Sequence, residues 1–213
     1  EFIDGNGQMA GFDLDLIHAI GKKMGVKIEM QNIAWDGLIP AVQSGNVDLA
    51  IAGMAITEER KKVLLFSDPY YESGLTIMVP KNSSIQSIKD FEGKKIAVQI
   101  GTMSSKKAKE VPNASVREFN TSADAFMELK NGGADAVINH IPVIKYYMLK
   151  NGGADSPFKI AGIPLSTASD AIATKKDNKE LMDKVNKAMK ELKDSGEFDA
   201  LYEKWFGEKP PKK

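Results

Sequence analysis

Apolar residues recur every three or four positions in several stretches of the chain, the spacing that gives a helix one buried face. Residues 11–25 show this spacing from Phe12 to Ile20 and end at Gly25, a common helix stop. Residues 178–193 show it most clearly. We predict helices over 11–25, 35–45, 57–63, 104–110, 123–130, 143–150, 178–193 and 198–206, with Thr57 capping the third.

Short apolar or alternating segments lie between these helices and are typical of strands. Residues 47–53 and 136–139 are apolar runs of the kind that parallel sheets bury, and residues 26–30 alternate apolar and charged positions. We predict strands at 26–30, 47–53, 74–79, 95–100 and 136–139. Strands that alternate with helices indicate an α/β fold, with a mostly parallel sheet and helices on both faces.

One segment of the chain is repeated in outline. Residues 42–53 and residues 129–140 each contain a helix end, a Gly-containing turn, an aspartate and an apolar strand. Such turn chemistry is common in α/β proteins, so the likeness can arise without any relation between the two segments. The alternative is a pair of similar α/β lobes whose strand ends face a shared crevice, where open α/β sheets bind ligands.

Composition excludes several classes of function. The 213 residues are 42% hydrophobic and 27% charged, as in a soluble globular protein rather than a disordered chain. The 29 basic and 29 acidic residues cancel, so no basic surface for nucleic acid is expected. No apolar run reaches the roughly 18 residues that span a bilayer. The chain has no cysteine and only two histidines, which excludes thiolate zinc sites and argues against a multi-histidine metal site.

Enzyme signatures are mostly missing from the chain. Residues 104–107 match the Ser-x-x-Lys pattern, but the companion motifs of that enzyme class are absent. The most informative segment runs from Ala52 to Tyr71. In it, Gly53 allows a backbone to approach a ligand closely, and Arg60 carries a fork of donors suited to a carboxylate. Taken alone, an arginine in this position is more often a solvated helix residue than a ligand contact.

Six motifs, taken together and in order, are similar to those of the polar amino-acid solute-binding proteins of ABC importers. They are Gly11-Phe-Asp-Leu-Asp-Leu16, Trp35-Asp-Gly-Leu-Ile-Pro-Ala41, Gly53-Met-Ala-Ile-Thr-Glu-Glu-Arg60, Phe66-Ser-Asp-Pro-Tyr70, Gly101-Thr102 and Tyr202-Glu-Lys-Trp-Phe-Gly207. The resemblance covers essentially the whole chain. It implies a two-lobed α/β fold like that of periplasmic binding proteins, with two crossover strands and a ligand cleft between the lobes.

The resemblance also implies which residues contact the ligand. The stacking aromatic falls on Trp35, the backbone that faces the α-ammonium on Gly53, and the carboxylate-binding arginine on Arg60. The other implied ligand-binding residues are Met54 and Ala55 in lobe one, and Gln99, Thr102, Met103, Asn139 and His140 in lobe two. No metal and no cofactor is expected.

Four positions depart from the family's pattern. Ala55 stands where the family usually has a hydroxyl residue, and Met103 where it has a small one. Asp170-Ala171 replaces an aromatic-Gly pair, and His140 replaces an aspartate that grips the α-ammonium. The last departure matters most, because a buried ammonium without a carboxylate partner is strongly disfavoured. We therefore expect an altered pocket.

The resemblance assigns residues 1–69 and 171–213 to lobe one, 75–165 to lobe two, and 70–74 and 166–170 to the hinge strands. The family's first strand would precede Glu1. Lobe one is therefore expected to lack that strand, which would leave unpaired edges or an apolar groove.

The function implied is capture of a glutamine- or arginine-like amino acid for an ABC importer, by a monomer that lies in the periplasm or outside the cell. A second hypothesis is an enzyme on the same fold, similar to the cyclohexadienyl dehydratases, with His140 as acid or base and Arg60 holding a carboxylate substrate. A third is the ligand-binding domain of a sensor.

Overall fold

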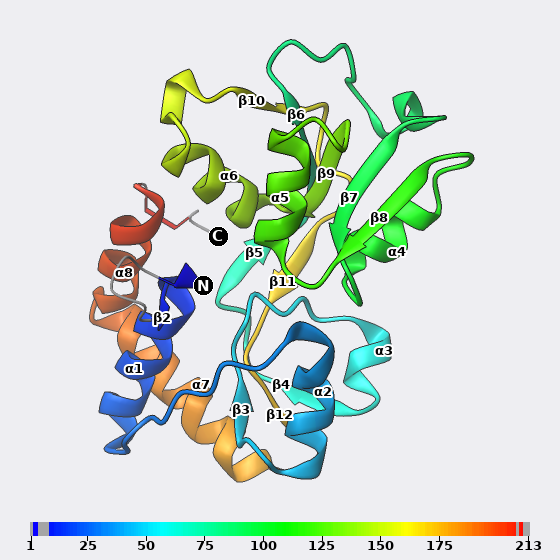
Figure 1. Ribbon diagram of the computed structural model, residues 1–213. Coiled ribbons are helices and arrows are strands. Elements are labelled where there is room, and N and C mark those ends of the chain that lie inside the picture. The colour runs from blue at the N-terminus through cyan, green and yellow to red at the C-terminus, as the bar shows by residue number, and fades with distance from the viewer. Residues whose placement is uncertain (1, 4–8, 208, 211–213) are drawn as a thin grey trace. The chain divides into compact units, whose positions relative to one another are not determined.

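The computed structural model describes residues 2–3, 9–207 and 209–210. Its chain divides into two units by internal contacts, shown as a ribbon in Figure 1. Unit 1 comprises residues 1–33, 38–71 and 169–213, and unit 2 comprises residues 34–37 and 72–168. Each unit thus contains segments from distant parts of the sequence. The lobe bounds predicted above stay a prediction.

Unit 2 is built on a five-stranded sheet in the order β10-β6-β9-β7-β8. The strands are β6 (Leu75–Pro80), β7 (Lys95–Gln99), β8 (Ser115–Phe119), β9 (Ala136–His140) and β10 (Phe158–Ala161). The helices are α4 (Met103–Lys109), α5 (Ser122–Lys130) and α6 (Ile141–Lys150), with short 3-10 turns at Ile88–Phe91 and Gly153–Asp155. Two buried clusters, which draw on alternate residues of β6 and β9, cover the two faces of this sheet.

The sheet of unit 2 is mixed and that of unit 1 is antiparallel, so the prediction of a mostly parallel sheet is wrong. In unit 2, β7 is parallel to β8 and β9, but β6 is antiparallel to β9 and β10. The register explains the difference: Leu75, which begins β6, lies opposite His140, which ends β9. The chain enters the sheet in β6 at the end where β9 leaves it. The order of predicted strands and helices along the sequence does not show in which direction each strand runs.

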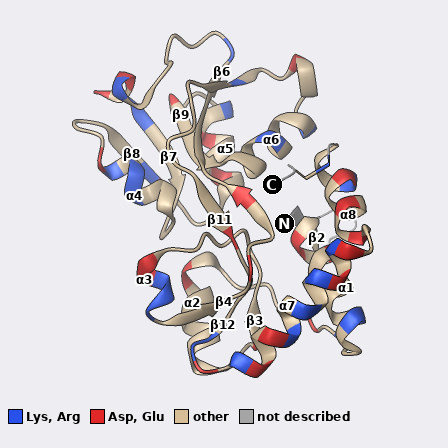
Figure 2. Cartoon of the chain, turned by 180° about the vertical axis from the view of Figure 1, so that it is seen from behind, with Lys and Arg blue, Asp and Glu red and all other residues tan. Residues whose placement is uncertain are grey.

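Unit 1 buries the apolar faces of three helices against one another. These are α1 (Phe12–Met24), α7 (Lys179–Asp194) and α8 (Glu197–Phe206). Phe12 lies at the centre of an aromatic cluster with Tyr70, Phe198, Tyr202 and Phe206. Acidic and basic residues are interspersed along α1 and α7, as Figure 2 shows.

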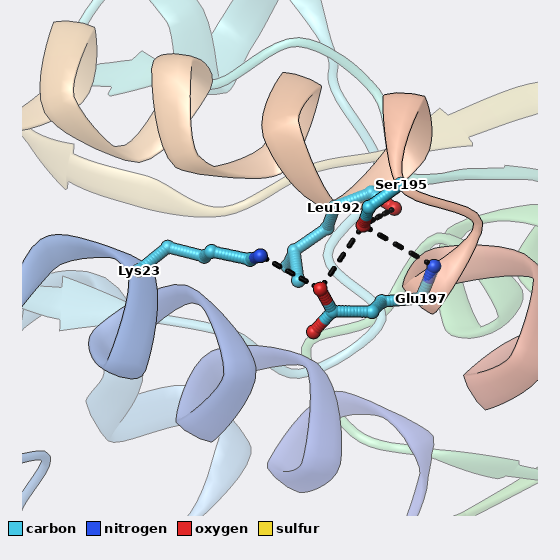
Figure 3. A network of polar contacts seen from close by, with 4 residues as sticks. All are labelled: Lys23, Leu192, Ser195 and Glu197. Atoms are coloured by element: carbon cyan, nitrogen blue, oxygen red, sulfur yellow. Dashed lines mark hydrogen bonds and ion pairs between the residues drawn. The ribbon is translucent and has the colours of Figure 1, made fainter.

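Polar contacts tie α8 to its neighbours at both ends. Asp15 of α1 accepts hydrogen bonds from Lys204 Nζ at 2.6 Å and Trp205 Nε1 at 2.8 Å. At the other end, Glu197 accepts from Lys23 Nζ at 2.7 Å and from Ser195 Oγ at 3.0 Å (Figure 3). The closing motif of the chain is therefore part of the structure of unit 1.

The sheet of unit 1 is small, with strands in the order β3-β12-β4. β12 (Ala173–Lys175) pairs antiparallel with both β3 (Leu49–Ala50) and β4 (Leu64–Phe66). The prediction of a strand at 26–30 is wrong, and β3 is shorter than the predicted 47–53. Residues 27–33 are irregular and make no backbone hydrogen bond to any described residue, although Ile28 and Met30 pack on the core. Alternating apolar and charged residues do not by themselves form a strand, because the backbone of a strand needs a second strand for its hydrogen bonds.

The remaining elements are short. β5 (Tyr71–Ser73) pairs with β11 (Ala168–Asp170), and β1 (Phe2–Ile3) with β2 (Met9–Ala10). α2 (Trp35–Ser44) and α3 (Glu58–Lys61) confirm two predicted helices, and Thr57 Oγ1 accepts from Arg60 N as the cap of α3. The other predicted helices are confirmed within a few residues at each end.

Candidate functional site

The loop after β3 in unit 1 is hydrogen-bonded to the buried carboxylate of Asp13. Gly53 N donates to Asp13 Oδ2 at 2.7 Å and lies 3.1 Å from the Tyr70 hydroxyl, which donates to the same Asp13 oxygen at 2.9 Å. Asp13 and Tyr70 are buried, whereas Gly53 is half-buried. Gly53 has φ of 54°, a left-handed conformation that favours glycine. These hydrogen bonds therefore fix the backbone of the loop at Gly53, which is still partly exposed to solvent.

Arg60 extends from α3 back along the same loop. Its Nη1 donates to the carbonyl oxygen of Ala55 at 2.8 Å. Burial lowers the pKa of the Arg60 guanidinium below its ordinary value, while the charges of Glu59 and Asp170 act in the opposite direction. An arginine remains charged at neutral pH even so. Unit 1 therefore contains a partly desolvated cation that is hydrogen-bonded to a backbone carbonyl oxygen.

Met54 and Ala55 contribute backbone rather than side chains to this region. Both side chains are buried, at 1% and 0% exposure. The Met54 carbonyl accepts from Ala171 N, and Ala55 forms an isolated antiparallel bridge with Asp170, which is itself 2% exposed. A hydroxyl at position 55 would therefore face the interior of unit 1, which gives a local reason why alanine fits there.

Unit 2 brings three neutral side chains into one hydrogen-bonded chain. Ser122 Oγ donates to Gln99 Oε1 at 2.9 Å and accepts from Asn139 Nδ2 at 2.9 Å. The free ends are also engaged: Gln99 Nε2 donates to Asn120 O at 3.1 Å, and Asn139 Oδ1 accepts from His140 N at 2.7 Å. The side chains stand at the ends of β7 and β9 and at the start of α5, so Ser122 fixes the orientation of both amides.

The other residues predicted in unit 2 lie at helix starts. Thr102 caps α4, accepting from Ser105 N and donating to the carbonyl oxygen of Gln99 at 2.7 Å. Met103 begins α4 and packs against a buried cluster of the sheet. His140 is the N-cap residue of α6, but its side chain does not form the cap hydrogen bond.

Trp35 is half-buried and belongs by its contacts to unit 2, although most of α2 belongs to unit 1. Its Nε1 donates to the carbonyl oxygen of Gly101 at 3.1 Å. A side chain at Gly101 would lie 3.5 Å from Trp35 Cδ1. Its indole thus lies against the Gly101-Thr102 turn rather than in a described core cluster.

The structure brings the predicted residues together in two groups. One group is the loop of unit 1, with Gly53, Met54, Ala55 and Arg60, and the other is the polar end of the sheet in unit 2. Sequence reasoning missed Asp13, Tyr70 and Ser122 as parts of these groups. Asp13 and Tyr70 belong to motifs quoted above, so the signal was present, whereas nothing near Ser122 distinguishes it in the sequence.

Among residues 2–3, 9–207 and 209–210, no three His, Asp or Glu side chains are grouped closely enough to hold a metal ion. None of the helices there is long and apolar enough to cross a membrane. A surface hollow of about 190 Å³, lined by Ile88, Lys89, Lys107, Glu110, Val111 and Pro112, contains none of the predicted binding residues.

Comparison with known proteins gives a consistent result. Residues 1–208 match the family described as bacterial extracellular solute-binding proteins, family 3. The arginine-binding extracellular protein ArtP of Bacillus subtilis (strain 168) is 40% identical over 213 residues, which are 98% of this chain and 82% of that protein.

Two solved structures are similar over nearly the whole chain. An ancestral arginine-binding protein bound to glutamine is 48% identical, with a TM-score of 0.90, over 97% of this chain and 92% of that one. The ancestral amino acid-binding protein AncCDT-1, a precursor of cyclohexadienyl dehydratase, is 42% identical, with a TM-score of 0.85, over 96% of this chain and 88% of that one.

Proposed function

Because the chain belongs to the bacterial extracellular solute-binding proteins, family 3, we propose that it captures a polar amino acid, of the arginine or glutamine kind, and delivers it to an ABC importer. The observation that carries this proposal is the position of Arg60. Its guanidinium is partly desolvated and hydrogen-bonded to Ala55 O, beside a loop whose carbonyls accept no hydrogen bond from described residues at Ala52 and Gly53.

Binding of this kind needs no reaction chemistry. The fork of donors on Arg60 matches the two oxygens of an α-carboxylate, and desolvation strengthens the pairing. The carbonyl oxygens of the Gly53 loop are acceptors for the α-ammonium, and Trp35 offers a face for the apolar stem of the ligand. Gln99 and Asn139 are neutral groups suited to the polar end of a ligand side chain.

His140 limits how well the ammonium is held. A neutral imidazole accepts a single hydrogen bond from an ammonium, whereas a protonated one repels it. Neither matches the charge-assisted bond that a carboxylate would make. We propose that ordinary α-amino acids bind this chain weakly, although its overall architecture suits them.

A calorimetric screen of the twenty amino acids tests the proposal. We expect arginine or glutamine to release measurable heat and the acidic amino acids to release none. Addition of the bound amino acid should also raise the melting temperature, since a ligand that binds only the folded state stabilises it. Absence of binding by every amino acid at millimolar concentration would refute the proposal.

The enzyme hypothesis has one observation in its favour, the similarity to AncCDT-1. That protein is itself named an amino acid-binding protein, and ArtP is likewise a binding protein. Incubation with prephenate or arogenate separates the two functions. We expect no aromatic product; formation of phenylpyruvate or phenylalanine that His140→Ala abolishes would favour the enzyme.

We further propose that the chain acts outside the cytoplasmic membrane, in the periplasm or at the cell surface, and as a monomer. The family's description as extracellular supports the location. Light scattering during size-exclusion chromatography tests the state of association. A mass near 23.3 kDa supports the monomer, and twice that mass contradicts it.

A further inference from the structure

We infer that Asp13 is a positioning residue for the ammonium end of the ligand: it fixes the Ala52–Gly53 peptide so that this peptide presents its carbonyl to a cation. The inference rests on the proposed function and deepens it. It assigns the negative charge near the ammonium to a buried residue that no sequence motif marks as a ligand contact.

Three elements converge on the Asp13 carboxylate. Asp13 lies in the first turn of α1 and is 8% exposed, Gly53 follows β3, and Tyr70 precedes β5. Gly53 N and the Tyr70 hydroxyl both donate to Oδ2, at 2.7 and 2.9 Å. Tyr70 is in turn held by its own backbone, since Tyr70 N donates to Asp170 O at 3.0 Å. The carboxylate therefore has a fixed position with two donors on one oxygen.

The hydrogen bond between Gly53 N–H and Asp13 also sets the direction of the Ala52 carbonyl, because both groups belong to one planar peptide. In a trans peptide the N–H and the C=O point in opposite directions, and no cis peptide occurs among the described residues. With Gly53 N–H directed at Asp13, the carbonyl of Ala52 points away from it. Neither Ala52 O nor Gly53 O accepts a hydrogen bond from any described residue. Both oxygens remain acceptors for an ammonium.

The charge of Asp13 adds to this effect. A carboxylate that accepts from an amide polarises the peptide, and in a chain of hydrogen bonds each bond strengthens the next. The Ala52 oxygen becomes a better acceptor, and the buried negative charge favours any cation bound on the far side of the peptide. Under the proposed function this contribution matters more than it would in a chain with an aspartate at position 140, because His140 supplies no carboxylate.

Asp15 provides a matched control for a merely structural role. It is a carboxylate in the same turn of α1 and has the same favourable relation to the helix N-terminus. Its partners are Lys204 and Trp205 of α8, not the Gly53 loop. If the acidic residues served only to stabilise α1, the substitutions Asp13→Asn and Asp15→Asn would change ligand binding alike.

The test compares L-arginine with 5-guanidinopentanoic acid, which lacks only the α-ammonium. We expect Asp13→Asn to weaken L-arginine binding about tenfold or more in calorimetry, while binding of the deamino analogue is unchanged. Tyr70→Phe should act in the same direction more weakly, and Asp15→Asn should leave the affinity ratio of the two ligands unchanged. An equal loss for both ligands in Asp13→Asn would overturn the inference.

A measurement without ligand separates this inference from the proposed function. The Gly53 amide proton should resonate downfield in the parent and move upfield in Asp13→Asn and Tyr70→Phe, as its hydrogen bonds weaken. An unmoved Gly53 resonance in both variants refutes the role of Asp13, even if arginine binds the parent. If the parent binds no amino acid although the resonance moves, the proposed function fails and the ammonium role of Asp13 fails with it.

Discussion

Unit 1 and unit 2 differ in the kind of groups found at their predicted ligand-binding residues. In unit 1 the relevant groups are a cation, Arg60, and a backbone loop held by a buried carboxylate, Asp13. In unit 2 they are neutral side chains, Gln99, Ser122 and Asn139, which hydrogen-bond to one another. Charge and backbone recognise what all α-amino acids share, whereas amides and hydroxyls discriminate among side chains. The comparison therefore predicts that the Arg60 and Gly53 groups of unit 1 contribute mainly to affinity, and that the neutral network of unit 2 contributes mainly to preference among ligand side chains.

The two units also differ in how completely their sheets are bonded. Unit 2 has five strands, and the central strand β9 has partners on both sides. The main sheet of unit 1 has three strands, and residues 27–33, of which Ile28 and Met30 pack on the core, make no backbone hydrogen bonds to described residues. Local stability follows such bonding, because an amide without a partner exchanges without any opening of the structure.

The largest expected difference is in amide hydrogen exchange. Amides of residues 27–33 should exchange at nearly intrinsic rates, and those of Val137 and Ile138 in β9 at least about a thousandfold more slowly. Exchange followed by NMR and normalised for intrinsic rates gives this comparison. Equal protection of the two segments would show that residues 27–33 pair with a strand in solution.

Substitution of the cation in unit 1 should have the largest effect on binding. Arg60→Ala is expected to reduce the free energy of amino-acid binding by about 2 to 5 kcal/mol, because the ligand carboxylate would be left unpaired in a partly desolvated site. Arg117→Ala, which removes an exposed arginine paired with Glu128, is the control. A dissociation constant unchanged by Arg60→Ala, measured by calorimetry, would remove Arg60 from the site.

Restoring a carboxylate in unit 2 should shift affinity in the opposite direction. His140→Asp is expected to tighten L-arginine binding about tenfold or more, since the ammonium gains a charged partner. An aspartate at this N-cap position also stabilises α6, so His140→Asn, which caps without the charge, is the matched control. Equal affinities of the two variants would show that the charge at position 140 does not reach the ligand.

Disruption of the neutral network should alter preference more than affinity. Ser122→Ala is expected to weaken binding by about 1 kcal/mol and to change the ratio of affinities for arginine and glutamine, because both amides lose their common partner. Ser122→Thr, which retains the hydroxyl, should restore the ratio, and Ser115→Ala at an exposed position should not change it. A parallel loss for both ligands would assign Ser122 a structural role only.

The smallest effect is expected at the surface of unit 1. The hydrogen bond from Lys23, and to a smaller extent the one from Ser195, lowers the pKa of the Glu197 carboxyl below its ordinary value (Figure 3). A lowered folded-state pKa stabilises the protein above the ordinary glutamate range, and this contribution is lost as the pH falls through the folded value. Because Glu197 is exposed, Glu197→Gln should lower the melting temperature at pH 7 only slightly, and the parent and variant should converge in acid. Convergence at alkaline pH instead would contradict this sign.

Local features of the fold followed from the sequence because their causes are local. Gly25 ends α1 in the left-handed conformation, and Thr57 caps α3 through its own hydroxyl. Both depend on residues within one helical turn. The family of the chain also followed from six motifs, because motifs record which residues a fold requires even when they do not show why.

Only the tertiary structure decided which residues meet. Asp13 and Tyr70 are separated by 57 positions in the sequence, and Gly53 lies 40 positions from Asp13. Residues 26–30 have the pattern of a strand without forming one, because pairing depends on a neighbour that alternation cannot supply. For the same reason the burial of Met54 and Ala55, and the direction of β6 beside β9, could not be inferred from composition or spacing. A sequence specifies the preference of each segment, but hydrogen bonds between distant segments are determined only when the chain packs.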